Sequence, residues 1–236
     1  TPTASDRETD PSPAEIAYSV VSAVGADGSS ALGRAARFGH TDICMTLTKA
    51  LNKAEMWLLD ENNGGRDGGR FSPLGLAASF GHSNTVKQAL ETLSTLYSHG
   101  KCCSLGFRSL KARLLSHREP SGLTLFHICA QWNNVACMNH LLTSSCDIDT
   151  GGHSIQIDLS TITCPLGNTP LHTAAQYGHI ESINFLLHYA QDNNNIVILL
   201  KSRNNSGSTA VSVASTWVRH VAVDLLTNWF TNTIEK

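Results

Sequence analysis

The side chains best suited to chemistry in this chain are thiols and imidazoles in two polar segments. Their members are Cys102, Cys103 and His117 in the first segment, and Cys146, His153 and Cys164 in or beside the second. If both segments project from one side of the fold, these groups could form a tetrahedral zinc site. The spacing argues against this, because it contains no CxxC or HxxxH pair. We therefore expect no metal and no cofactor.

Cys146 is also a candidate nucleophile, because Asp147, Asp149 and His153 follow it closely. No motif for an oxyanion hole accompanies it, so we expect no catalytic residue. A thiol- or zinc-dependent enzyme, or a metal-stabilised module built from these segments, is the alternative. Bound metal and sensitivity to thiol reagents would discriminate between the two hypotheses.

Residues 101–119 form a basic segment with five cations and one acid, Glu119. Leu105, Leu110 and Leu114 can share one helical face. This pattern suits a basic amphipathic helix for an acidic partner, RNA or an anionic membrane. The simpler interpretation, which we favour, is a solvated helix whose leucines pack on the rest of the fold.

The Gly-rich segment 62–70 lacks the ending of a phosphate loop and is interpreted as a turn. Apolar alternation at Ile155, Ile157 and Leu159 predicts a strand or hairpin.

Composition describes the framework that must position these segments. The chain has 236 residues, 41% hydrophobic and 15% charged, and a net charge of −2 from 17 basic and 19 acidic residues. We expect no nucleic-acid partner from this balance, and no membrane span, because no apolar run approaches the roughly 18 residues required. Seven irregularly spaced cysteines without a signal-peptide pattern predict reduced thiols in the cytoplasm, with the nucleus or export by a removed signal as alternatives.

A short pattern occurs five times along the chain. The copies are SALGRAARFGH from Ser30, SPLGLAASFGH from Ser72, TLFHICAQWNN from Thr124, TPLHTAAQYGH from Thr169 and TAVSVASTWVR from Thr209. In the fourth copy Thr169 can cap a helix, Pro170 suits its first turn, and Gly178 suits its end. A second helix follows with Ile180, Ile183, Leu186 and Leu187 on one face. One such pair cannot bury its apolar face alone, so the copies are expected to stack.

These copies resemble the ankyrin repeat family, and the fourth is the most similar. The resemblance covers about residues 28–230 and implies an all-α solenoid of about five stacked helix pairs. It also implies that the chain binds another protein in a concave groove, as a monomer and without catalysis. The copies start 42, 52, 45 and 40 residues apart, against a family period of about 33, so every connection is lengthened. In the third, SSCDIDT still matches the start of the family hairpin, which gives Cys146 and Asp147 a structural explanation.

The first residues require a separate description. Ser12, Pro13 and Glu15 have the spacing of a capping box, so we expect a helix at 13–24 that caps the stack. Residues 1–12 are expected to be a disordered linker, and 13–236 one ankyrin repeat domain. The absence of an initiator Met and the aromatic residues close to the last one suggest an excised piece of a longer protein.

The second residue after the Ala-Ala position is aromatic in all five copies. These residues are Phe38, Phe80, Trp132, Tyr177 and Trp217, in a chain with only 6% aromatic residues. The resemblance implies that this position lies toward the groove, so we predict a column of protein-binding anchors with Arg37, Gln131 and Gln176 as polar neighbours. The alternative is that the rings pack on one another, or under the long connections, and only shield the scaffold.

Overall fold

The computed structural model describes residues 30–51, 57–58, 71–98, 110–144 and 157–234. Five helix pairs follow one another: α2 (Ala31–Arg37) and α3 (Thr41–Leu51), α4 (Pro73–Ser79) and α5 (Ser83–Ser98), α7 (Leu125–Gln131) and α8 (Val135–Ser144), α9 (Pro170–Tyr177) and α10 (Ile180–Asp192), α12 (Ala210–Thr216) and α13 (His220–Ile234). Two further helices, α6 (Leu110–Ser116) and α11 (Ile196–Lys201), lie in the connections. The prediction of an all-α stack of five pairs is confirmed.

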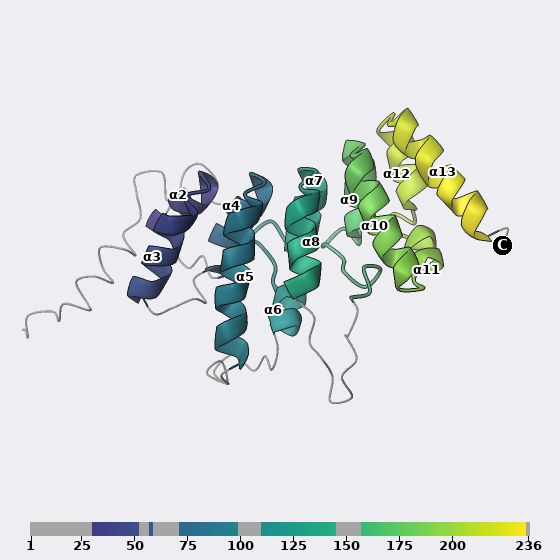
Figure 1. Cartoon of the computed structure of the whole chain (residues 1–236). Helices are drawn as coiled ribbons and strands as arrows, with labels where there is room; N and C mark the ends of the chain where they lie inside the picture. Colours follow the sequence, from purple (N-terminus) through teal and green to yellow (C-terminus); the bar gives the residue numbers. More distant parts are fainter. Residues whose placement is uncertain (1–29, 52–56, 59–70, 99–109, 145–156, 235–236) are drawn as a thin grey trace, which may run out of the picture.

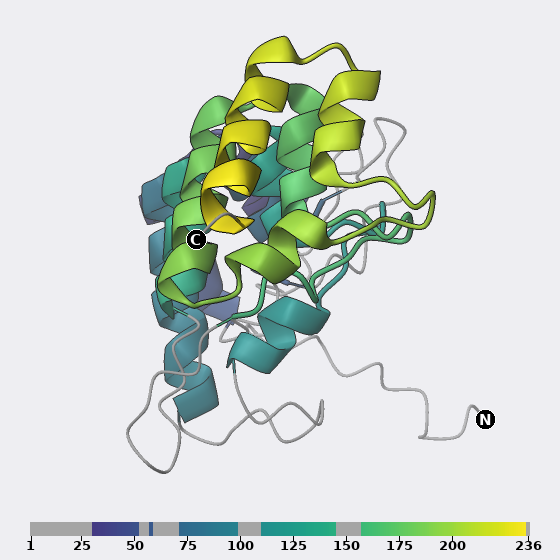
Figure 2. The same ribbon diagram turned by 90° about the vertical axis from the view of Figure 1, so that its right-hand side faces the viewer.

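The pairs stack in a single row, from α2 and α3 at one end to α12 and α13 at the other (Figure 1). We call α2, α4, α7, α9 and α12 the first helices, and their partners the second helices. Each first helix packs on the next, and so does each second helix. Seen along the row, the first helices form a layer between the second helices and a set of projecting turns (Figure 2).

A capping residue precedes every first helix. Ser30, Ser72, Thr124, Thr169 and Thr209 each accept the backbone N–H three residues later. Such a cap satisfies one of the N–H groups that a helix start leaves unpaired. The alanines in mid-helix, among them Ala78 and Ala175, are fully buried. Small side chains there allow neighbouring first helices to approach closely, and Leu186 and Leu187 of α10 extend the same core.

Three projecting turns, which we call the fingers, precede the third, fourth and fifth first helices. They are 119–122, 164–167 and 204–207, and in each the fourth N–H donates to the first carbonyl at 2.7–2.8 Å. Neighbouring fingers are also bonded, since Asn205 N–H donates to the Leu166 carbonyl at 3.1 Å. The finger side of the first helices is therefore an ordered face of the stack.

The connections correct one prediction and confirm another. Residues 157–169 contain no strand. Ile157 and Leu159 are buried instead, and the Ile157 N–H donates to the Tyr189 hydroxyl at 3.2 Å. The alternation therefore reflects packing on the stack rather than pairing in a sheet. Leu114 of α6 is fully buried, as expected for a helix that packs on the stack.

Several predictions lie outside the described residues. They concern the linker 1–12, the helix 13–24, the turn 62–70 and a set of side chains in the connections. These side chains are Cys102, Cys103, Leu105, Leu110, Cys146, Asp147, Asp149, His153 and Ile155.

Candidate protein-binding surface

The five predicted rings lie at the C-terminal ends of the first helices. Tyr177 is the last residue of α9, and each of the other four is the residue that follows its helix. The exposed fractions are 65% for Phe38, 53% for Phe80, 53% for Trp132, 40% for Tyr177 and 53% for Trp217. Large aromatic side chains are rarely this exposed in a row. We call these five residues the aromatic stripe.

The rings of the aromatic stripe do not pack on one another. Phe38, Phe80 and Tyr177 each lie beside the histidine two residues later, with ring centroids 6.0–6.4 Å apart. Across the part of the chain that the structure describes, no ring contact joins two members of the stripe. This arrangement argues against the alternative in which the rings pack on one another. Much of the long connections lies outside the described residues, so the alternative in which the rings pack under them stays a prediction.

Hydrogen bonds between repeats fix the spacing of the stripe. In the last four copies, the side chain two residues after the ring bonds to a backbone carbonyl of the preceding copy, that of the residue just before its ring. The four bonds are His82 Nε2 to Arg37 at 2.8 Å, Asn134 Nδ2 to Ser79 at 2.9 Å, His179 Nε2 to Gln131 at 2.9 Å and Arg219 Nε to Gln176 at 3.2 Å. Sequence reasoning missed these residues, although the recurring GH after the aromatic residue was a usable signal.

Two of the predicted polar neighbours bridge adjacent repeats on the surface. The Arg37 guanidinium lies 5.4 Å from the Phe80 ring centroid and 6.0 Å from that of Phe38, within the range of a cation–π contact. Gln131 donates to the Tyr177 hydroxyl at 3.1 Å. The third neighbour, Gln176, contributes its carbonyl to the bonds between repeats.

The residue after each ring has a left-handed backbone, and three of the five are Gly39, Gly81 and Gly178. A Cβ on Gly178 would lie 2.9 Å from Arg219 Cδ, so glycine also gives room to the bond between repeats. The other two are Asn133 and Val218, both with φ of 56°. Asn133 Oδ1 accepts from the Ser182 hydroxyl at 2.8 Å and from its N–H at 3.2 Å, so it caps α10 of the next pair.

The opposite ends of α4, α7 and α9 are buried and polar. His172 Nδ1 bonds to the Thr169 hydroxyl at 2.8 Å, and its Nε2 bonds to the Ser208 carbonyl at 3.0 Å. His127 makes the equivalent bonds to Thr124 and to the Asn168 carbonyl, both at 2.7 Å. Burial lowers the pKa of His127 to about 4, and it lowers the pKa of His172 as well. Both rings are therefore neutral links between a helix cap and the residue that follows the next finger.

The second pair has a different arrangement at this end. Gly75 stands where His127 and His172 occur, and the buried side chain of Glu119 occupies the space beside it. Glu119 accepts from the Ser72 N–H, from the Ser72 hydroxyl at 2.7 Å, and from His117 Nε2 at 3.1 Å. A carboxylate from the finger thus replaces the histidine of the helix.

The surroundings of the described thiols indicate a structural role. Cys44, Cys129, Cys137 and Cys164 are free and buried. Burial raises the pKa of Cys44 and of Cys137 to about 11, and that of Cys129 further. Thiolates are the reactive form of cysteine, so the environments of Cys44, Cys129 and Cys137 oppose reactivity. In the described residues, no group of three or more His, Cys, Asp or Glu could hold a metal ion.

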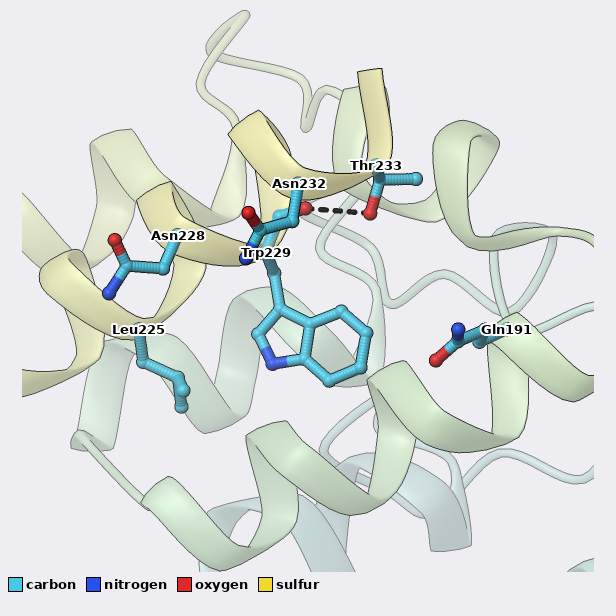
Figure 3. Close-up of a pocket in the computed structure, with 6 residues that line it drawn as sticks. All are labelled: Gln191, Leu225, Asn228, Trp229, Asn232 and Thr233. Atoms are coloured by element: carbon cyan, nitrogen blue, oxygen red, sulfur yellow. Dashed lines mark hydrogen bonds between the residues drawn. The ribbon is translucent and has the colours of Figure 1, made fainter. Parts of the chain in front are cut away.

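An open cavity of about 270 Å³ lies between α10 and α13 (Figure 3). Its lining side chains are Gln191, Leu225, Asn228, Trp229, Asn232 and Thr233. None of them titrates near neutral pH, so the cavity offers no acid or base for catalysis.

Comparison with known families identifies the repeats. The family model for ankyrin repeats, in three copies, matches residues 32–196. This span includes the first four helix pairs. No helix in the described part of the chain is long and apolar enough to cross a membrane.

Proposed function

Because the chain belongs to the ankyrin repeat family, we propose that it binds another protein along the aromatic stripe and catalyses no reaction itself. Ankyrin repeats generally act as protein–protein interaction modules, and stacked repeats create extended binding surfaces. The proposal assigns the anchoring role to Phe38, Phe80, Trp132, Tyr177 and Trp217.

The exposure of the stripe is the observation that carries this proposal. Each ring is 40–65% exposed, although burial of aromatic surface is strongly favourable in water. Rings bury a large area on binding while they lose little rotamer freedom. The bonds between repeats hold the helix ends that carry them at fixed spacing, so the surface is organised before a partner arrives.

The same proposal includes a monomer in a reducing compartment, the cytoplasm or the nucleus. Free thiols at Cys44, Cys129, Cys137 and Cys164 support this location, because oxidising compartments favour disulfides.

Affinity capture with matched variants tests the binding site. The full chain is immobilised beside Trp132→Ala, Tyr177→Ala and the control Ile43→Ala, which removes an equally exposed apolar side chain from α3. We expect each ring deletion to weaken partner binding by about 2 kcal/mol, or about 30-fold. Ile43→Ala should retain the partner. Equal capture by the ring variants, or loss with Ile43→Ala alone, would contradict the proposal.

A further inference from the structure

We propose that the partner presents an acidic, extended peptide segment to the aromatic stripe, with carboxylates beside Arg37 and Arg219 and apolar side chains on the rings between them. This inference rests on the proposed function, and it adds the chemical class of the partner.

Charge is segregated between the two faces of the stack. The inner face consists of the first helices, the turns that follow them and the fingers. Among the residues that the structure describes there, five arginines are exposed: Arg34, Arg37, Arg118, Arg203 and Arg219. Among the described residues of these elements no carboxylate is exposed, since Glu119 is buried and Asp158 is half-buried.

The second helices have the opposite balance. Their exposed charged side chains are Asp42, Glu91, Glu181, Asp192 and Asp224 against Lys49 and Lys87. The net charge of the chain is only −2. The positive inner face is therefore a local feature and not a consequence of a basic composition.

Four of the inner-face arginines keep their charge uncompensated. Arg118 donates to the carbonyls of Leu115 and His117, and Arg203 donates to that of Gly207. Arg219 donates to the Gln176 carbonyl, and Arg37 lies over two rings. Within the described part of the chain no carboxylate pairs with any of these four. A guanidinium has five donors, so each can still bind an incoming carboxylate.

The order of side chains along the stripe predicts the pattern of the peptide. Arg37 lies between Phe38 and Phe80 at one end, and Arg219 follows Trp217 at the other. In the middle, the rings are flanked by the amides of Gln131 and Gln176. The carboxylate of Glu181 also lies there, where it accepts from Asn133 Nδ2 at 3.2 Å, so an acidic residue is disfavoured at this place. A complementary segment therefore has acidic residues toward both ends and apolar residues in the centre.

Arginine beside exposed rings also suits single-stranded RNA, in which bases stack on aromatic side chains. Charge favours a peptide instead. Binding of a polyanion depends on many phosphate contacts, whereas the described inner face has five cations, and the exposed carboxylates of the second helices would repel a long polyanion.

Selection from a library of short random peptides on the full 236-residue chain tests the inference. Enriched peptides should combine Asp or Glu with apolar residues.

An enriched peptide is then labelled with fluorescein and titrated by fluorescence anisotropy, beside a version in which each Asp is replaced by Asn and each Glu by Gln. We expect Arg37→Glu and the amide peptide each to weaken binding by about tenfold. Lys49→Glu, which changes the net charge equally on α3, should leave affinity within about twofold. Arg37→Gln provides a milder second variant, and circular dichroism checks that all variants fold.

The outcomes separate the two proposals. Enriched peptides that are neutral or basic, but need Trp132 and Tyr177, would overturn the acidic partner and leave the proposed function standing. Peptides that bind Trp132→Ala and Tyr177→Ala unchanged would contradict both. A selection that enriches nothing overturns the peptide inference alone, since a folded partner could still use the rings. Tighter binding of labelled oligouridine than of any peptide, weakened by Arg37→Glu, would overturn it in favour of RNA.

Discussion

The N-terminal ends of α4, α7 and α9 are buried and their polar side chains are bonded, whereas the C-terminal ends of all five first helices carry rings that are 40–65% exposed. At Thr169 and His172 the bonds link a cap, a ring and the residue that follows the next finger. At Tyr177, eight residues along the same helix, 40% of the side chain is exposed. The same short helix therefore contributes a scaffold contact at one end and a proposed binding residue at the other.

This difference teaches where substitution is tolerated. Removing one partner from a buried polar group leaves the other without a bond, at a cost of about 1–3 kcal/mol or more for a charged group. Removing an exposed ring leaves no buried group unpaired. Mutations at the two ends should therefore separate stability from binding.

The largest expected effect is at Glu119. Glu119→Ala should lower the free energy of unfolding by about 3–5 kcal/mol, because it removes the buried partner of Ser72 and His117. Urea unfolding followed by circular dichroism measures this.

A second substitution sharpens the test. Gly75→His alone should destabilise the chain, since even a Cβ there would lie 2.5 Å from Glu119 Oε1. In the Glu119→Ala background it should recover stability, because a histidine at this position could bond to Ser72 as His172 does to Thr169. Additive losses in the double variant would contradict the idea that Glu119 substitutes for a histidine.

Lowering the pH should reduce the stability of the chain through the buried histidines at the N-terminal ends of the first helices. His127 has a pKa of about 4 in the folded chain, below its ordinary 6.5. Between pH 6.5 and pH 4, the unfolded chain therefore binds a proton at His127 that the folded chain does not bind. Stability is therefore complete at neutral pH and falls as the pH drops from 6.5 to 4. The loss from this group should be on the order of 3 kcal/mol, and His172, whose pKa is also lowered, adds to it. Urea titrations at several pH values measure the slope. His127→Asn should be less stable at pH 7 but show a flatter profile, and an unchanged slope would contradict the assignment.

Substitutions at the exposed ends should change the free energy of unfolding only slightly. Trp132→Ala and Tyr177→Ala should each cost less than about 1 kcal/mol of unfolding free energy, because their rings are half-exposed. Leu186→Ala, at a fully buried position, should cost about 2–5 kcal/mol. Thermal and urea unfolding of the three variants compare them directly. If the ring deletions destabilise the chain as much as Leu186→Ala, the aromatic stripe is structural and the partner site must lie elsewhere.

Local patterns made most of the scaffold predictable. The cap at Thr169, the left-handed Gly178 and the apolar face with Leu186 depend on neighbours within one or two turns, and all three appear as expected. The ring positions were also predictable, because a recurring residue at one place in each copy must form a row once the copies stack.

Features that join distant residues were not predicted. Glu119 and Ser72 are 47 residues apart, and the only hint was Gly75 where two other copies carry histidine. The bonds from His82 and His179 to the preceding repeat needed the stack geometry. Alternation around Ile157 predicted a strand, because an extended segment packed on one side has the same period. The helix α11 was not predicted either, since its apolar run lies in a connection.

The smallest expected effect is at the turns after the rings, where the same substitution should have opposite signs in two repeats. Val218 holds a left-handed conformation with φ of 56° and is 65% exposed. A β-branched side chain is strained there, so Val218→Gly should gain about 0.5–1 kcal/mol after the entropy of glycine in the unfolded chain is subtracted.

Asn133 has the same φ, but its side chain caps α10 through Ser182. Asn133→Gly should therefore lose about 0.5–1.5 kcal/mol. Differential scanning calorimetry of both variants checks the signs, and Val218→Ala, which keeps the left-handed strain, should gain less than Val218→Gly. Stabilisation by both glycines would mean that Asn133 is retained only for its backbone. Destabilisation by both would mean that Val218 makes a contact at the end of the stack that outweighs its strain, and the exposed ends of the first helices would then contribute to the scaffold after all.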